Sequence, residues 1–419
     1  GGGVLAMLER YVGEDAFRDG IRLHMERFAD KTATAEDFIA SVAEGSDRAE
    51  IEAAFRSFIG QPGVALLTVG LDCTSGDTPR LKVSQSRYAA LGSSIDPAES
   101  TWQVPMCVSY EADGGVASTC DFIEESTGSI SLETDTCPAW VHPNADGAGY
   151  YRFALDDAGW QALIDNAANL SANEALVFLD SLDAALRAGH VAANTYLDGM
   201  AALLQHDAWD VVENVANALE MLSNIVEPGQ METMQVAMRS MVRPVFDALE
   251  DDGSSGNTLL RERLLRFLIV IARDADLRAP LAEQAIARIG LGGEPDPDAA
   301  PAGQLETILS VGVQDVGEPF FDLLLEQAKA SVEPAFREAA IGALARVEEP
   351  PLVAKLQAAV LEGKFKGTEA LGIVNRQMVR AATTGLTFSW LQDNGDMIVN
   401  MIPQTFRARY LPMFGSGFC

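Results

Sequence analysis

The chain has 419 residues, of which 48% are hydrophobic, and it carries a formal net charge of −31. This length exceeds what one hydrophobic core organises and predicts about two to four domains. The excess of acids argues against nucleic acid as a partner, because such a surface repels phosphate backbones. No apolar run approaches the roughly 20 residues that cross a bilayer, so we expect no membrane span.

Residues 1–62 predict helices. Apolar residues recur at helical spacing in four segments, and Gly13 is expected to end the first of them. Thr34 and Asp37 predict a capping box at the start of the third helix, with Asp in place of the usual Glu. His24 lies on the apolar stripe of the second helix, and we interpret it as a packed core residue and not as a metal ligand.

Residues 63–155 predict a β-sandwich of about seven strands, because short β-prone runs alternate with clusters of Gly, Asp, Ser and Pro. The predicted strands are Val64–Leu71, Arg80–Ser84, Thr101–Tyr110, Val116–Ile123, Ser129–Leu132 and Gly149–Leu155. The segment between Arg87 and Ser100 is expected to form a loop.

A dense turn lies among the last of these strands. Pro143, Asn144, Asp146, Gly147 and Gly149 place five turn-forming residues within seven positions. Each of them favours a tight turn or a positive-φ backbone. We expect a strand to follow this turn and a helix to follow the strand.

Four of the five cysteines lie in the strand-rich region, and none forms a Cys-x-x-Cys pair, which argues against structural zinc. Asp113-Gly114 predicts a two-residue type I′ turn, which places Cys107 opposite Cys120 with Cα atoms about 4.5 Å apart. We therefore predict a disulfide between Cys107 and Cys120, with Cys73 and Cys137 as a further candidate pair. Disulfides imply an oxidising compartment, the bacterial periplasm or the cell exterior, whereas buried cytosolic thiols are the alternative.

From residue 156 to 419 the apolar period changes to about 3.6 residues, which predicts stacked helix pairs in a HEAT-like α-solenoid. Ser171 and Asn257 are expected to cap helices, and Gly189, Gly229 and Gly290 to end them. The chain is thus expected to be multidomain and mainly α, with one β-sandwich. Helices are predicted at 157–168, 172–189, 192–204, 208–226, 230–250, 257–275, 277–289, 303–313, 317–331, 333–347, 350–362 and 367–374.

Several motifs follow one another in an order known from one enzyme family. They are Gly1, Met7-Leu8-Glu9, Gly13–Phe17, Thr34–Asp37, Gln61-Pro62-Gly63 and the pattern Asn-x-x-x-x-Gly-Tyr-Tyr-Arg over 144–152. In this order the chain resembles the C-terminal portion of an aminopeptidase N-type (gluzincin) zinc metallopeptidase. The resemblance is specific over 1–63 and 138–152 and loose elsewhere, where Leu179–Gly189 and Gly385–Asn394 are similar to helices of the family.

The resemblance implies three parts. Residues 1–62 would be the C-terminal helices of the catalytic metallopeptidase domain, 63–155 the β-sandwich and 156–419 the helical domain. The catalytic zinc motif of the family, H-E-x-x-H, does not occur in the sequence, whose four histidines include no pair at positions i and i+4. We therefore expect zinc in the parent protein, no cofactor bound by this chain, and a chain truncated at both ends.

The implied function is that of the non-catalytic C-terminal part of a zinc-dependent aminopeptidase, which removes N-terminal residues from peptides. This part would cap the active site and gate substrate access. Its partners would be the N-terminal and catalytic domains of the same protein and the peptide substrates. The alternative is a stand-alone interaction scaffold made of a β-sandwich and an α-solenoid. Independent catalysis by the chain has no support, because no nucleophile set is singled out by spacing.

Two arginines near the end of the chain are candidates for substrate binding. Arg407 and Arg409 lie beside aromatic residues in a segment that follows the last long helix. A guanidinium presents a planar fork that matches a carboxylate. The family resemblance favours Arg409, with Arg407 as the second choice, for contact with the backbone or carboxylate of a substrate. The alternative is a surface ion pair with a nearby acid.

Overall fold

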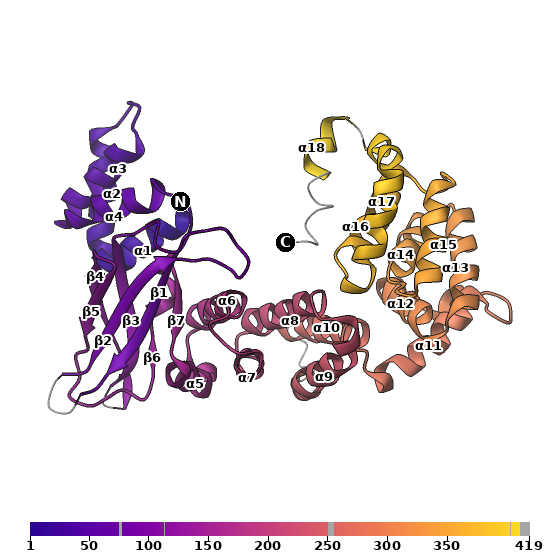
Figure 1. Ribbon diagram of the computed structural model, residues 1–419, viewed down its shortest axis with the longest axis horizontal. Coiled ribbons are helices and arrows are strands. Elements are labelled where there is room, and N and C mark those ends of the chain that lie inside the picture. The colour runs from indigo at the N-terminus through magenta and orange to yellow at the C-terminus, as the bar shows by residue number, and fades with distance from the viewer. Residues whose placement is uncertain (75–77, 113, 250–254, 403, 411–419) are drawn as a thin grey trace. The chain divides into compact units, whose positions relative to one another are not determined.

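The computed structural model describes residues 1–419 except 75–77, 113, 250–254, 403 and 411–419 (Figure 1). The described chain is mostly helical with small sheets, and it divides into two compact units, Gly1–Val215 and Ala216–Cys419. Within the described ranges, no helix combines the length and the apolar character that a bilayer crossing requires.

The first unit begins with four helices, α1 (Gly2–Val12), α2 (Glu14–Arg27), α3 (Ala35–Ser46) and α4 (Glu50–Ile59). The predicted break at Gly13 is confirmed, and this glycine takes a φ of 90°. The capping box is confirmed as well, because the Asp37 N–H donates to Thr34 Oγ1 at 3.2 Å and the Thr34 N–H donates to Asp37 Oδ2 at 2.9 Å. His24 packs with Phe28 and Phe38, at centroid distances of 4.9 and 5.2 Å.

Two sheets follow these helices. One has the strand order β5-β2-β1-β7 and the other β4-β3-β6. Strand β1 pairs antiparallel with β2 and parallel with β7. Apolar residues of both sheets and of α1–α4 form one continuous core, so the first helices and the sheets share their buried surface. The strands are β1 (Ala65–Asp72), β2 (Arg80–Arg87), β3 (Val104–Ala112), β4 (Gly115–Ile123), β5 (Thr127–Ser131), β6 (Val141–His142) and β7 (Arg152–Leu155).

Two predicted strands were wrong at their starts, for the same physical reason. The third strand begins at Val104 and not at Thr101, because the side-chain amide of Gln85 bonds both the N–H and the carbonyl of Trp102 at 2.8 Å. The last strand begins at Arg152 and not at Gly149, whose N–H and carbonyl are bonded by the side-chain amide of Asn144 at 2.7 and 2.9 Å. Backbone groups held by a side chain are not available to a ladder. The short strand β6 was not predicted.

The remaining helices show the predicted 3.6-residue periodicity, and the buried apolar residues of α11 to α17 form one core. They are α5 (Asp157–Asn166), α6 (Ala172–Ala188), α7 (Ala193–Leu203), α8 (Trp209–Ser223), α9 (Met231–Ala248), α10 (Ser255–Val270), α11 (Ala275–Ile289), α12 (Leu305–Asp315), α13 (Glu318–Ala330), α14 (Pro334–Leu344), α15 (Pro350–Leu361), α16 (Gly367–Met378), α17 (Ala381–Met401) and α18 (Arg407–Tyr410).

Several helix ends agree with the predictions. Ser171 caps α6 in a capping box with Glu174, and Gly189 ends that helix in the left-handed region. Gly290 ends α11 in the same way. These ends were predictable because each depends on residues within one turn.

Other helix ends were wrong. The predicted helix 257–275 stops at Val270, because Asp274 caps the next helix by accepting the Leu277 N–H at 3.2 Å. Asn257 lies inside α10, and α8 stops at Ser223, before Gly229. The 21-residue helix α17 lies beyond the last predicted range and contains Gly385–Asn394, the segment likened to a helix of the family.

The turn between β6 and β7 is joined to α6 by buried hydrogen bonds. The carboxylate of Glu174 accepts the hydroxyl of Ser109 at 2.6 Å, the hydroxyl of Ser171 at 2.9 Å and the N–H of Asp146 at 3.3 Å. His142, which is fully buried, lies within 3.1 Å of the Glu174 carbonyl through Nε2 and accepts the Asn144 N–H at Nδ1. These bonds require the neutral imidazole with its proton on Nε2.

Burial and hydrogen bonds together set the ionisation of His142 and Glu174. It lowers the pKa of His142 to about 4, despite the attraction of the Glu174 carboxylate. Burial alone would raise the pKa of Glu174, but hydrogen bonds from Ser109 and Ser171 lower it overall. Near neutral pH the site therefore holds a neutral histidine and a charged carboxylate.

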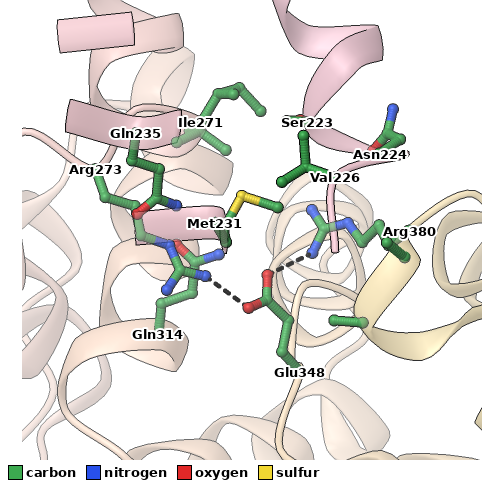
Figure 2. Close-up of a pocket in the computed structure, with 13 residues that line it drawn as sticks. Ser223, Asn224, Val226, Met231, Gln235, Ile271, Arg273, Gln314, Glu348 and Arg380 are labelled. Atoms are coloured by element: carbon green, nitrogen blue, oxygen red, sulfur yellow. Dashed lines mark hydrogen bonds and ion pairs between the residues drawn. The ribbon is translucent and has the colours of Figure 1, made fainter. Parts of the chain in front are cut away.

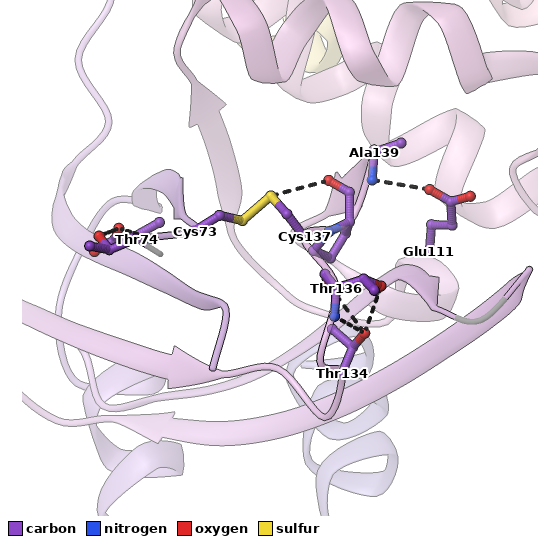
Figure 3. Close-up of a disulfide and its surroundings, with 9 residues drawn as sticks. Cys73, Thr74, Glu111, Thr134, Thr136, Cys137 and Ala139 are labelled. Atoms are coloured by element: carbon purple, nitrogen blue, oxygen red, sulfur yellow. Dashed lines mark hydrogen bonds between the residues drawn. A yellow bond between two sulfur atoms is a disulfide. The ribbon is translucent and has the colours of Figure 1, made fainter. Parts of the chain in front are cut away.

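Two disulfides cross-link the strand-rich region. Cys107 and Cys120 are direct partners on β3 and β4, with Cα atoms 4.0 Å apart, and a disulfide joins them. A second disulfide joins Cys73 and Cys137, which follow β1 and precede β6 (Figure 3). The predicted turn residue Asp113 lies outside the described residues.

We predict that acid destabilises the fold through His142. The unfolded chain takes up a proton near pH 6.5, whereas folded His142 does so only near pH 4. The folded state therefore binds fewer protons in this window, and stability falls as the pH drops from 6.5 to 4, by roughly 3 kcal/mol in all. Urea unfolding at pH 7, 6 and 5 measures this slope. His142→Gln should reduce it, and His190→Gln, at an exposed position, should not. An unchanged slope in His142→Gln would contradict the assignment.

We predict that removing the Cys73–Cys137 disulfide costs more stability than removing Cys107–Cys120. The two bonds join residues 64 and 13 positions apart. Loop-closure entropy then gives losses of about 4 and about 3 kcal/mol. Paired Cys→Ala variants are to be compared by urea unfolding, and non-reducing peptide mass spectrometry should find both linkages in the parent chain. Unlinked thiols at these four positions would refute the pairing.

Candidate functional site

The predicted site residues are Cys107, Cys120, Arg407 and Arg409, and the structure describes the side chains of the first three. Cys107 and Cys120 form a disulfide. Arg407 begins the short helix α18, is partly buried and donates from Nε to the carbonyl of Ile402 at 3.1 Å. The side chain of Arg409 lies outside the described residues. The substrate-binding role of the two arginines therefore stays a prediction.

The buried residues Ser109, His142 and Glu174 have the composition of a hydrolytic triad but not its geometry. The Ser109 hydroxyl donates to Glu174, and both ring nitrogens of His142 bind backbone groups. The histidine is therefore not positioned to take a proton from the serine. In the described part of the chain, no three His, Cys, Asp or Glu side chains are grouped so that they could hold a metal ion.

A small cavity of about 110 Å³ lies in the second unit, where several helix ends meet (Figure 2). Asn224 follows α8, Gln235 belongs to α9, Gln314 lies near the end of α12, and Ala381 and Ala382 begin α17. The first N–H groups of a helix have no intrahelical acceptor, so the start of α17 offers donors to the cavity. The lining thus combines amide donors with charged side chains.

Glu348 bridges two arginines at this cavity. Its Oε2 lies 2.9 Å from Nη2 of Arg273, and its Oε1 lies 3.8 Å from Nη1 of Arg380 (Figure 2). Arg273 follows α10 with a φ of 51°, and Arg380 immediately precedes α17. Arg380 also donates to the backbone carbonyl of Arg346 at 3.1 Å. One carboxylate therefore lies between two guanidinium groups that are held by the ends of neighbouring helices.

Further arginines lie near this pair. Burial and then the charge of Arg380 lower the pKa of Arg346 to about 10, and Arg266 acts in the same direction. Burial also lowers the pKa of Arg380, and Arg273 and Arg376 add to this effect. We call Arg266, Arg273, Arg346, Arg376 and Arg380 the arginine cluster. The sequence analysis did not identify it, because its members are spread over more than a hundred positions and share no local motif.

Comparison with known proteins finds one matching domain family and several similar proteins. Residues 140–419 match the ERAP1-like C-terminal domain family. Over 98% of its length the chain aligns at 24% identity with glutamyl aminopeptidase of Rattus norvegicus, of which it covers 43%. Over 99% of its length it aligns at 22% identity with aminopeptidase M1-A of Oryza sativa subsp. japonica, covering 47% of that protein. A shorter match, at 32% identity over 41% of the chain, covers 18% of probable M1 family aminopeptidase 1 of Encephalitozoon cuniculi.

These findings confirm the resemblance to the C-terminal portion of an aminopeptidase N-type protein. The chain belongs to the ERAP1-like C-terminal domain family. It spans less than half the length of the relatives that it matches from end to end.

Proposed function

We propose that the chain is the non-catalytic C-terminal part of a zinc-dependent aminopeptidase that removes N-terminal residues from peptides. The observation that carries this proposal is the alignment of nearly the whole chain with less than half of proteins named aminopeptidases. Zinc would be held by the part of the protein that this chain does not include. The described residues supply no fitting ligand group, and no catalytic step is assigned to them.

The proposal includes a division into three parts. Residues 1–62 would be the last helices of the catalytic domain, which is supported by the order of the motifs from Gly1 to Gly63. Residues 63–155 would form a β-sandwich, which is supported by the presence of both sheets in one core. Residues 156–419 would form the α-solenoid. The two disulfides support a periplasmic or secreted location.

The helical part would cap the active site and gate access to it. Such a cap limits the size of the substrate and excludes bulk water from the reaction. The strongly acidic composition supports this role, because a negative field concentrates peptides at their positively charged N-terminus. The proposal is tested with the complete protein and with a version that lacks residues 216–419, the second compact unit, which leaves α6 and Glu174 in place. Loss of the cap should reduce the discrimination between short and long peptides, while equal discrimination would argue against gating.

We predict that the isolated 419-residue chain neither holds stoichiometric zinc nor cleaves aminoacyl-arylamides, whereas the complete protein does both. The reason is that the catalytic motif lies outside this chain. Metal analysis and arylamide hydrolysis are to be measured on both proteins at equal molar concentration. One tightly held zinc per isolated chain would overturn the assignment. A complete gene without an upstream H-E-x-x-H would favour the interaction scaffold.

We propose that Arg409, with Arg407 as the second choice, contacts the backbone or carboxylate of the substrate in the complete enzyme. Arg409→Ala is expected to lower kcat/KM several-fold for peptides with a free C-terminus, because a charge-assisted hydrogen bond is lost. The melting temperature should stay unchanged. Arg22→Ala, an exposed arginine of α2, is the control. Unchanged kinetics in both Arg409→Ala and Arg407→Ala would leave only the ion-pair alternative.

A further inference from the structure

The arginine cluster carries an excess of positive charge inside a strongly acidic protein. Its five guanidinium groups are accompanied by three carboxylates that act on Arg346 or Arg380, those of Glu220, Glu306 and Glu348. Glu220 is already paired with Arg263 at 2.8 Å. Glu306 lies 3.8 Å from Arg376. The three carboxylates that act on Arg346 or Arg380 are thus fewer than the five guanidinium groups of the cluster.

Two members of the cluster have no ion-pair partner. Among the described residues, the guanidinium groups of Arg266 and Arg346 make no hydrogen bond and no ion pair within 4 Å. Arg346 is mostly buried, and the nearby charges of Arg380 and Arg266 repel it. A buried and unpaired cation normally costs stability, and Arg346 is such a cation.

Glu348 indicates the kind of group that fits between these arginines. Its carboxylate lies between the guanidinium groups of Arg273 and Arg380 beside the cavity. The Glu348 side chain is 37% exposed, so it can leave this position without unfolding the site. Two guanidinium forks and the amide donors of Gln235, Gln314 and the start of α17 then remain to bind oxygen atoms.

We propose that Arg273 and Arg380, the two arginines of the cluster that line the cavity, bind a compact, multiply charged oxyanion of the phosphate or polycarboxylate class, in competition with Glu348. The cavity volume of about 110 Å³ suits a compact ligand. A multiply charged ligand is favoured because a single negative charge is already supplied by Glu348. This site is independent of the proposed peptidase activity and is complete within the second unit.

The test uses the 419-residue chain and follows its melting temperature with inorganic phosphate, citrate or chloride at matched pH and ionic strength. Phosphate, citrate or both should raise the melting temperature saturably above the value in chloride, and calorimetry then gives Kd. Binding of phosphate alone would indicate a phosphate ligand, and binding of citrate alone would indicate a polycarboxylate ligand. Equal melting temperatures in all three salts would overturn the proposal.

Four variants, one of them a control, separate binding from general salt effects. Glu348→Gln should bind the oxyanion several-fold more tightly, because the competing carboxylate is removed. Arg273→Gln and Arg380→Gln should each weaken binding at least several-fold, because their guanidinium groups line the cavity, and the Arg273 side chain is 31% exposed, so its replacement tests the idea even if Arg380→Gln folds poorly. Arg22→Gln, which is 65% exposed on α2, changes net charge equally and should bind as the parent does. Unchanged affinity in both Glu348→Gln and Arg273→Gln would refute the proposal.

Discussion

The junction between the strands and α6 depends on one buried carboxylate, that of Glu174. An ionised carboxylate removed from water costs several kcal/mol unless donors replace its hydration. Here the donors come from β3, from the turn after β6 and from the N-terminus of α6 itself. Because no one of these segments supplies all the donors, the charge is stable only when the three are assembled. Fully buried His142 adds a second link by bonding the backbone on both sides of its ring.

The parts of this junction that the sequence predicted are local. Ser171 was predicted to cap a helix, and the turn-forming residues of the β6–β7 segment lie within seven positions. The pairing of Cys107 with Cys120 followed from a count along one hairpin. The hydrogen bond from Ser109 to Glu174, by contrast, joins residues 65 positions apart, and no local sequence pattern predicts this contact. The roles of His142 and Glu174 therefore required the tertiary structure.

The errors in the predicted elements have a common cause, which is side chains that compete for backbone hydrogen bonds. Gln85 and Asn144 take the backbone groups of Trp102 and Gly149 out of the sheet, although both positions lie in β-prone runs. Asp274 does the same for a helix, since its carboxylate starts α11 within an apolar run that continues the pattern of α10. Hydrophobic periodicity indicates which residues can be buried. It does not indicate where a side chain that binds backbone groups will end a helix or a strand.

The acidic composition of the chain makes it unexpected that Arg266 and Arg346 lack an ion-pair partner among the described residues. With twice as many acids as bases, the chain has ample carboxylates to neutralise every arginine, and it does so at Arg278 with Asp315 and at Arg337 with Glu369. The absence of a partner at Arg266 and Arg346, within the part that the structure describes, is thus a matter of local arrangement and not of scarcity. A bound anion would relieve part of the repulsion between these guanidinium groups and would stabilise the folded state through linkage.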